Sequence, residues 1–266
     1  MLKQRVRLSV ARCAPAASPG GIRVLLYHAI DVADPVDRMH LRVSRARFVE
    51  QMTALRDDGF RVVPLMAISS PQEHDDRARV AITFDDGYRC QAWAAAVLRD
   101  FEFPATFFVV PRFLDGQFVT TRYWETWGHL RWDEIAALAG DGFDIGAHST
   151  THPDLRTCSD GQLEDEVSGA RALMEQRLGK AIRTFSYPYG RHNERVRRAV
   201  AHAGYELACT SRYGINRGAG PSYAIHRTEV GGADDLSAFR SKLRGKFDWL
   251  GYWQDLSSWN RRGEPA

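Results

Sequence analysis

The chain has 266 residues, of which 44% are hydrophobic and 26% are charged, and these fractions exclude a mainly disordered or fibrous protein. Its 36 Lys and Arg residues nearly balance its 33 Asp and Glu residues, and a net charge of +3 argues against the concentrated basic face of a nucleic-acid-binding protein. No apolar run approaches the roughly 20 residues of a transmembrane helix, so we expect no membrane-spanning segment.

Residues 1–20 are predicted to form a flexible basic tail. The tail contains Lys3, Arg5, Arg7 and Arg12, but no sustained apolar stretch of the kind found in secretory signals follows them. We therefore expect a cytoplasmic protein, with a secreted or periplasmic form as the alternative. Residues 21–266 are expected to form a single domain.

From residue 22 onward, strand-like and helix-like stretches alternate. Strands are expected at 22–27, 61–64, 80–84, 105–109, 143–147, 184–187, 206–210 and 224–226, helices at 47–58, 93–101, 133–139, 159–178, 193–202 and 235–248, and long loops at 70–77 and 115–128. This alternation predicts an α/β fold with a parallel sheet. About seven strands in one chain favour a distorted (β/α) barrel, in which chemistry takes place at the carboxyl ends of the strands.

The first motif is the sequence TFDDG at 83–87. Asp85 and Asp86 directly follow a predicted apolar strand, and neighbouring side chains on a strand point in opposite directions. One carboxylate can therefore bind a cation while the other accepts a proton. An ordinary turn with the same residues is the alternative.

The second motif is the sequence HSTTHP at 148–153, which follows the strand expected at 143–147. Residues four apart share one face of a helical turn, so we expect His148 and His152 to reach one ion from a single turn that Pro153 ends. With one Asp they provide three protein ligands, the number found in catalytic zinc sites.

The third motif is the sequence SYPYG at 186–190. Tyr187, Pro188 and Tyr189 form a rigid aromatic turn that offers ring faces to a sugar and backbone N–H groups to an oxyanion. A tight turn with packed tyrosines is the alternative.

In this order, the three motifs resemble the polysaccharide deacetylase family, also called the NodB-homology domain or carbohydrate esterase family 4. The resemblance covers residues 80–230, and the sequence YHAI at 27–30 resembles an extension found in the exopolysaccharide-modifying branch. It implies a NodB-like barrel in which Asp85 is the general base. It further implies that Asp86, His148 and His152 bind the metal and that the N–H of Tyr189 holds the oxyanion.

Ile225 and His226 resemble the last motif of the family. There, the histidine is the general acid and its apolar neighbour lines the acetyl pocket. A rim histidine that is hydrogen-bonded to its neighbours is the alternative for His226. This sequence also departs from many members by having Ser186 where they have an arginine that orients the catalytic Asp.

Other polar and aromatic residues follow the predicted strands. His28 and His192 could face the site, although a structural role is favoured for both. Trp124, Trp127 and Trp132 either stack on sugar rings or cover the outside of the barrel.

The activity implied by the resemblance is hydrolysis of N-acetyl groups on the amino sugars of a polysaccharide or oligosaccharide. The expected cofactor is a divalent metal, Zn²⁺ first, with Co²⁺, Ni²⁺ or Fe²⁺ as alternatives. The expected partner is the N-acetylated sugar, and no nucleic acid. A deformylase, an O-deacetylase and a catalytically dead carbohydrate-binding protein are the alternatives.

Overall fold

The computed structural model describes residues 20–30, 37, 40–70, 77–116, 127–218, 220 and 222–252. Three predicted segments lie wholly or partly outside this part of the chain. They are the basic tail (1–19) and the two loops (71–76 and 117–126), the second of which contains Trp124. Across the described residues, no helix is both long enough and apolar enough to cross a membrane.

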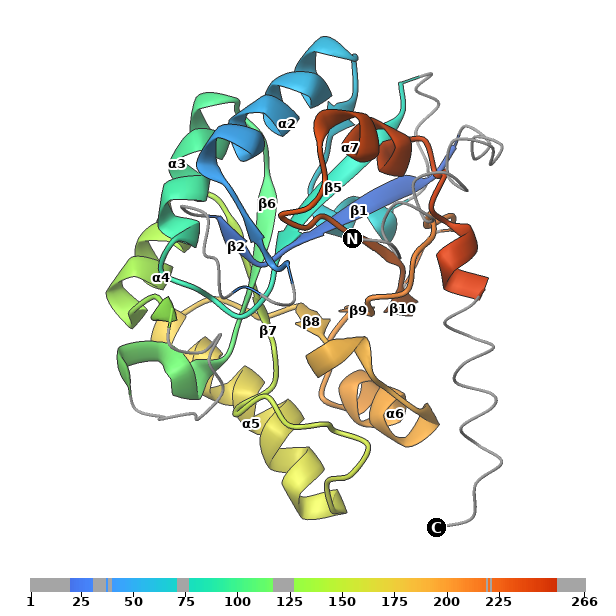
Figure 1. Ribbon diagram of the computed structural model, residues 1–266. Coiled ribbons are helices and arrows are strands. Elements are labelled where there is room, and N and C mark those ends of the chain that lie inside the picture. Colours follow the sequence, from blue (N-terminus) through green and yellow to red (C-terminus); the bar gives the residue numbers. More distant parts are fainter. Residues whose placement is uncertain are drawn as a thin grey trace.

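A parallel sheet with helices around it forms the centre of the molecule (Figure 1). Its strands run in the order β10-β9-β8-β7-β6-β5-β1-β11, and β4 pairs with β5. The sheet strands are β1 (Ile22–Tyr27), β4 (Arg61–Val62), β5 (Arg79–Phe84), β6 (Ala105–Val109), β7 (Asp144–Ala147), β8 (Thr184–Ser186), β9 (Leu207–Cys209), β10 (Ser222–Ile225) and β11 (Arg227–Glu229). A separate parallel pair consists of β2 (Ala29–Ile30) and β3 (Arg42–Val43).

The sheet curves into a nearly closed barrel because its two end strands are successive in the chain. β10 pairs with β9, and β11 pairs with β1, with only His226 between them. If β10 and β11 are taken as one bent strand, the ring has seven positions, namely β1, β5, β6, β7, β8, β9 and β10–β11. The predicted barrel of about seven parallel strands is confirmed.

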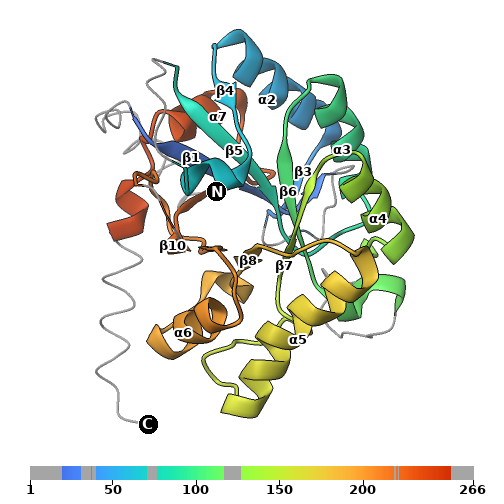
Figure 2. The ribbon, with the colours of Figure 1, turned by 180° about the vertical axis from the view of Figure 1, so that it is seen from behind.

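The helices lie around the outside of the sheet in both views (Figure 2). They are α2 (Arg45–Asp57), α3 (Gln91–Asp100), α4 (Trp132–Gly140), α5 (Asp160–Leu178), α6 (Glu194–His202) and α7 (Leu236–Leu243), with short 3₁₀ turns η1 (Leu65–Ile68), η2 (Pro111–Gly116) and η4 (Pro188–Gly190). Alternate strand residues divide the apolar core between two regions. Leu25, Ile82 and Phe107 pack toward the helices, whereas Val24 and Phe108 belong to a smaller cluster inside the barrel.

Three element predictions need correction. The last strand was expected at 224–226, but the chain forms β10 and β11 on either side of His226. The last helix was expected at 235–248, but α7 ends at Leu243, and Gly245 follows with φ of 74°. The helix expected at 133–139 begins one residue earlier, at Trp132, and ends at Gly140.

Candidate metal centre and active site

Asp85 and Asp86 lie where β5 ends, at the carboxyl edge of the sheet. The N–H of Asp85 still donates to the carbonyl of Tyr27 on β1, at 3.0 Å. Asp86 and Gly87 then adopt left-handed φ angles of 74° and 68°, and a Cβ at Gly87 would lie 3.1 Å from Cγ1 of Val109. This turn separates the directions of the two carboxylates, as the motif predicted.

The segment that carries both histidines is a loop and not the predicted helical turn. Ser149 and His152 have φ angles of 60° and 62°, which a right-handed helix does not contain. The N–H of His152 donates to Oγ of Ser149 at 2.9 Å. The two imidazoles therefore converge because the chain folds back on itself, and the helical turn predicted from the i, i+4 spacing is wrong.

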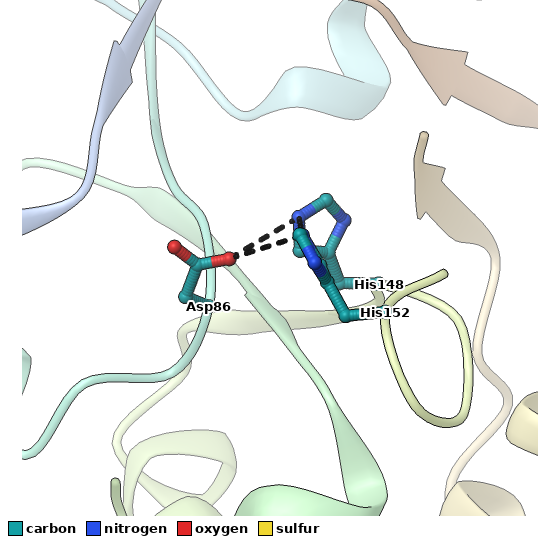
Figure 3. Close-up of side chains that lie close together, drawn as sticks. All are labelled: Asp86, His148 and His152. Atoms are coloured by element: carbon teal, nitrogen blue, oxygen red, sulfur yellow. Dashed lines mark hydrogen bonds and ion pairs between the residues drawn. The ribbon is translucent and has the colours of Figure 1, made fainter. Parts of the chain in front are cut away.

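Asp86, His148 and His152 form one buried cluster (Figure 3). Oδ1 of Asp86 lies 3.4 Å from Nε2 of His148 and 3.5 Å from Nε2 of His152, and the two Nε2 atoms are 3.2 Å apart. Ligand atoms at about 2.1 Å around a tetrahedral zinc ion are separated by about 3.4 Å. The spacing and chemistry of these three donors therefore fit a tetrahedral cation.

Contacts with neighbouring residues favour the protonation states in which an imidazole and a carboxylate can bind a cation. Nδ1 of His148 lies 2.7 Å from the carbonyl oxygen of Ser186, so this nitrogen carries the proton and Nε2 offers a lone pair toward the cluster. Burial raises the pKa of Asp86, but His148 and His152 outweigh it and hold the pKa well below its ordinary value. Asp86 is thus ionised, beside a histidine whose neutral tautomer is fixed by Ser186, and these are the forms in which both side chains can bind a cation.

Asp85 lies beside this cluster but points into the barrel toward Arg227. Nη1 and Nη2 of Arg227 donate to Oδ1 and Oδ2 of Asp85, both at 2.7 Å. Oγ of Ser186 donates to Oδ2 of Asp85 at 3.0 Å, and Nε2 of His148 lies 3.7 Å from the same oxygen. Burial raises the pKa of Asp85, but Arg227 and then His148 outweigh it, and the net pKa is lowered.

Arg227 is the site residue that sequence reasoning missed. Its partner is 142 positions away along the chain, so no local motif joins them. Ser186 in place of the arginine that the resemblance implies was a signal, because Asp85 then needs another cation. Arg227 directly follows the strand expected at 224–226, which made it a candidate for that cation.

The aromatic turn places its three residues differently. Tyr187 is fully buried, and its hydroxyl donates to the carbonyl of Tyr223 at 3.1 Å; Pro188 is buried too. Tyr189 has a left-handed φ of 58°, is 37% exposed, and lies with its ring centroid 4.6 Å from that of His152. Of these side chains, Tyr189 borders the cluster of Asp86, His148 and His152. Tyr187 packs in the core, as expected for the alternative interpretation of a tight turn with packed tyrosines.

His226 and Ile225 lie at the bend between β10 and β11. Nε2 of His226 is 2.6 Å from Nη1 of Arg212, and its backbone N–H donates to Oδ1 of Asn216 at 2.9 Å. These contacts match the rim histidine that was the alternative. Ile225 is 1% exposed and packs in the apolar cluster inside the barrel.

Two further histidines lie near the carboxylates. The charge of His28 lowers the pKa of Asp85 and of Asp86, and Nδ1 of His28 is buried without a hydrogen-bond partner among the described residues. Burial lowers the pKa of His129 to about 4, against the opposing charge of Asp86. His28, which follows β1, thus lies at the site in addition to His148 and His152, as one sequence alternative allowed.

The remaining candidates have structural surroundings. The ring of His192 packs 4.9 Å from that of Tyr187, and burial lowers its pKa to about 4. Trp132 packs against the main core under the guanidinium of Arg177, so it covers the outside of the barrel. Trp127 has Arg42 over its ring at 4.3 Å.

A model of the polysaccharide deacetylase family matches residues 72–208, which are 137 of the 266 residues. The chain belongs to the polysaccharide deacetylase family. Among the curated relatives of this deacetylase-family chain, the chitooligosaccharide deacetylase of Bradyrhizobium sp. (strain ANU 289) is 30% identical over 146 residues, covering 53% of this chain and 60% of the relative. That of Rhizobium leguminosarum bv. phaseoli is 29% identical over 137 residues, covering 49% and 54%. The chain thus spans little more than half the length of these relatives.

Solved structures of deacetylases share the fold. IcaB from Ammonifex degensii superposes with a TM-score of 0.71 and 23% identity, covering 86% of this chain and 98% of IcaB. The deacetylase PplD from Streptococcus pyogenes, solved with acetate, gives a TM-score of 0.73 and 21% identity, covering 85% and 99%. These likenesses concern the fold, and they confirm the predicted NodB-like barrel.

Proposed function

We propose that this polysaccharide deacetylase family member is a metal-dependent hydrolase that removes N-acetyl groups from the amino sugars of a polysaccharide or oligosaccharide. The observation that carries the proposal is that two adjacent carboxylates have different partners. Asp86 lies within the triad with His148 and His152, whereas Asp85 is held outside it by Arg227. Named activities of the relatives support the choice of an N-acetylated sugar.

The cofactor that fits best is Zn²⁺, because an Asp–His–His set leaves one tetrahedral position open; Co²⁺, Ni²⁺ and Fe²⁺ accept similar donors. A divalent cation at this triad would polarise the amide carbonyl and activate the attacking water. The protein fixes the triad through Asp86 at the end of β5 and the two imidazoles of the 148–152 loop.

Asp85 is proposed as the general base. Each carboxylate oxygen has two lone pairs, and Oδ1 of Asp85 accepts one hydrogen bond from Arg227 among the described residues. Its second lone pair can take a proton from water. The backbone N–H of Tyr189, on the rim beside His152, is proposed to hold the oxyanion that forms at the carbonyl carbon.

The departing amine needs a proton, and the geometry favours His28 over His226 as its donor. His28 follows β1 beside both carboxylates, and its Nδ1 is buried without a hydrogen-bond partner in the part of the chain that the structure describes. The side chain of Arg227 points into the barrel. In contrast, Nε2 of the neighbouring His226 lies against Arg212. His226 remains the alternative donor that the family resemblance implies.

The test is hydrolysis of N-acetylated chitooligosaccharides by the metal-depleted and the Zn²⁺-loaded protein, with the released acid identified. We expect acetate, in equal amount to new free amine, and only with metal. Asp85→Asn should keep one equivalent of Zn²⁺ but lower kcat at least 100-fold, since general base catalysis contributes about 10²–10⁴-fold. Asp100→Asn, at the exposed end of α3, is the matched control and should leave kcat unchanged.

N-formylated and O-acetylated amino sugars, assayed in parallel, separate the alternatives. Formate released from the N-formylated sugar, with no acetate from the N-acetylated one, would identify a deformylase. Acetate released from the O-acetylated sugar without new free amine would identify an O-deacetylase. Full activity of Asp85→Asn would refute the base assignment, and metal bound without turnover of any substrate would indicate a dead carbohydrate-binding protein. His28→Gln should lower kcat about 100-fold and His226→Gln should leave it near wild type; the reverse result returns the donor role to His226.

A further inference from the structure

Arg227 is a buried cation at the centre of the barrel. It begins β11, whose residues pair with β1 in the register Val24 to Arg227. Its side chain is 1% exposed, and its guanidinium lies 5.6 Å from the ring centroid of Phe108, within the apolar interior. A charge in such a place is costly unless every donor is satisfied.

The donors of Arg227 are satisfied by the ends of three other strands. Its Nε donates to the carbonyl of Thr210 at 2.7 Å, just after β9. The two terminal nitrogens form the fork on Asp85, after β5, and Nη2 also donates to Oγ of Ser186 on β8 at 2.9 Å. Such a planar, bidentate pair fixes both the position and the rotation of a carboxylate.

Stability alone does not account for this pair. Buried ion pairs are often no more stabilising than apolar side chains of equal volume, because desolvation offsets the attraction. The interior around Arg227 already contains Val24, Phe108, Cys209 and Ile225, which an apolar residue would join. The ion pair therefore points to a need for Asp85 to be charged and held in one orientation.

We propose that Arg227 is the positioning residue of Asp85, and that positions 186 and 227 form one unit in which only one residue can be arginine. Ser186 has a short side chain that reaches both Asp85 and Arg227, at 3.0 Å and 2.9 Å. A guanidinium from β8 would enter the volume that the Arg227 fork occupies and would repel it. The inference rests on the proposed role of Asp85 as base.

The first experiment removes the bidentate hydrogen bonding of Arg227 and keeps its positive charge. Arg227→Lys retains a cation but lacks the planar pair of donors, so Asp85 loses its fixed rotation. We expect kcat to fall about 100-fold, the loss that a misplacement of about 1 Å can cause, with KM within about twofold and Zn²⁺ stoichiometry unchanged. Arg23→Lys is the matched control, because Arg23 is also buried and bidentate to an aspartate, Asp248, outside the site.

The second experiment moves the guanidinium to the other strand. Arg227→Met should be at least as inactive as Arg227→Lys, and the double variant S186R/R227M should recover at least tenfold in kcat over Arg227→Met. S186R alone should lose activity, since two guanidinium groups then compete for one carboxylate. Wild-type kcat in Arg227→Lys, or a double variant no more active than Arg227→Met, overturns the proposal.

A crystal structure of Arg227→Lys provides a readout that does not depend on turnover. We expect the Asp85 carboxylate to be rotated relative to the wild-type protein, with Asp86, His148 and His152 in place. An unrotated carboxylate overturns the positioning role even if the protein hydrolyses no sugar. Absence of activity in the wild-type protein would instead refute the proposed function, so the two failures are distinguishable.

Discussion

Glu166 on α5 holds the loop that carries both histidines of the proposed metal triad. Its Oε2 accepts hydrogen bonds from the N–H groups of Thr150 and Thr151, at 2.9 Å and 2.8 Å, and its Oε1 accepts from the hydroxyl of Thr151. The loop contains left-handed residues at both ends and has no helical hydrogen bonds of its own to hold it. One carboxylate therefore connects the geometry of His148 and His152 to α5.

Glu166→Ala should weaken metal binding without unfolding the protein. Residues that orient metal ligands typically contribute 10–100-fold to affinity, so we expect the dissociation constant for Zn²⁺ to rise at least tenfold in a chelator competition assay. Glu164→Ala, on an exposed part of the same helix, should bind as tightly as wild type. Equal affinities in the two variants would show that the loop keeps its shape without Glu166.

The convergence of Asp86, His148 and His152 could be predicted from the sequence, and the residues that hold these side chains and Asp85 in place could not. Asp86, His148 and His152 follow predicted strands directly, and parallel strands bring their carboxyl ends to one edge. Glu166 and Arg227 act across 15 or more positions and come from a helix and from the last strand. Their identity depends on which elements pack together, which no local pattern of residues contains.

At the scale of elements, Gly146 on β7 lets the barrel interior close. A Cβ at this position would lie 2.5 Å from ring carbons of Phe108 on β6 and 2.5 Å from Oγ1 of Thr184 on β8. Both neighbours are themselves buried, so neither can move away freely. Glycine here is a packing requirement between three adjacent strands.

We expect Gly146→Ala to lower the free energy of unfolding by about 1–3 kcal/mol, the usual cost of overpacking a core, measured by urea denaturation. Gly161→Ala is the control, because Gly161 lies in the first turn of α5 with nothing within 4 Å of its added Cβ. That variant should gain up to about 1 kcal/mol. A stable Gly146→Ala would mean that Phe108 repacks at little cost.

The positions of helices and strands could be predicted from the spacing of apolar residues in the sequence where one face of the element is buried. β1 and β6 have the predicted bounds, and α5 (Asp160–Leu178) matches the helix expected at 159–178 to within one residue, with Ser159 and Gly179 as its caps. The pattern fails at His226, where the chain leaves β9 to pair with β1. That change of partner depends on closing the barrel, so it is a property of the whole sheet and not of residues 222–229.

At the scale of the whole molecule, Arg23 ties the first strand to the end of the described chain. Its Nε donates to the carbonyl of Leu243 at 2.9 Å, and its terminal nitrogens bind both oxygens of Asp248, at 2.8 Å and 3.0 Å. Nη1 also donates to Oγ1 of Thr228 on β11, at 3.0 Å. One buried side chain thus joins β1, β11 and α7, which lies beside β1 in Figure 1.

Removing this cation should destabilise the entire barrel rather than one edge. Arg23→Met leaves Asp248, whose side chain is 21% exposed, without its partner, and breaking such a pair typically costs about 3 kcal/mol or more. Arg240→Met breaks the exposed pair with Asp58 between α7 and α2 and should leave the urea midpoint near that of the wild type, because exposed ion pairs contribute little to stability. Urea denaturation followed by both fluorescence and circular dichroism should give one transition for Arg23→Met, shifted to lower urea. Two separate transitions would mean that α7 detaches by itself and that β1 and β11 hold the barrel closed without it.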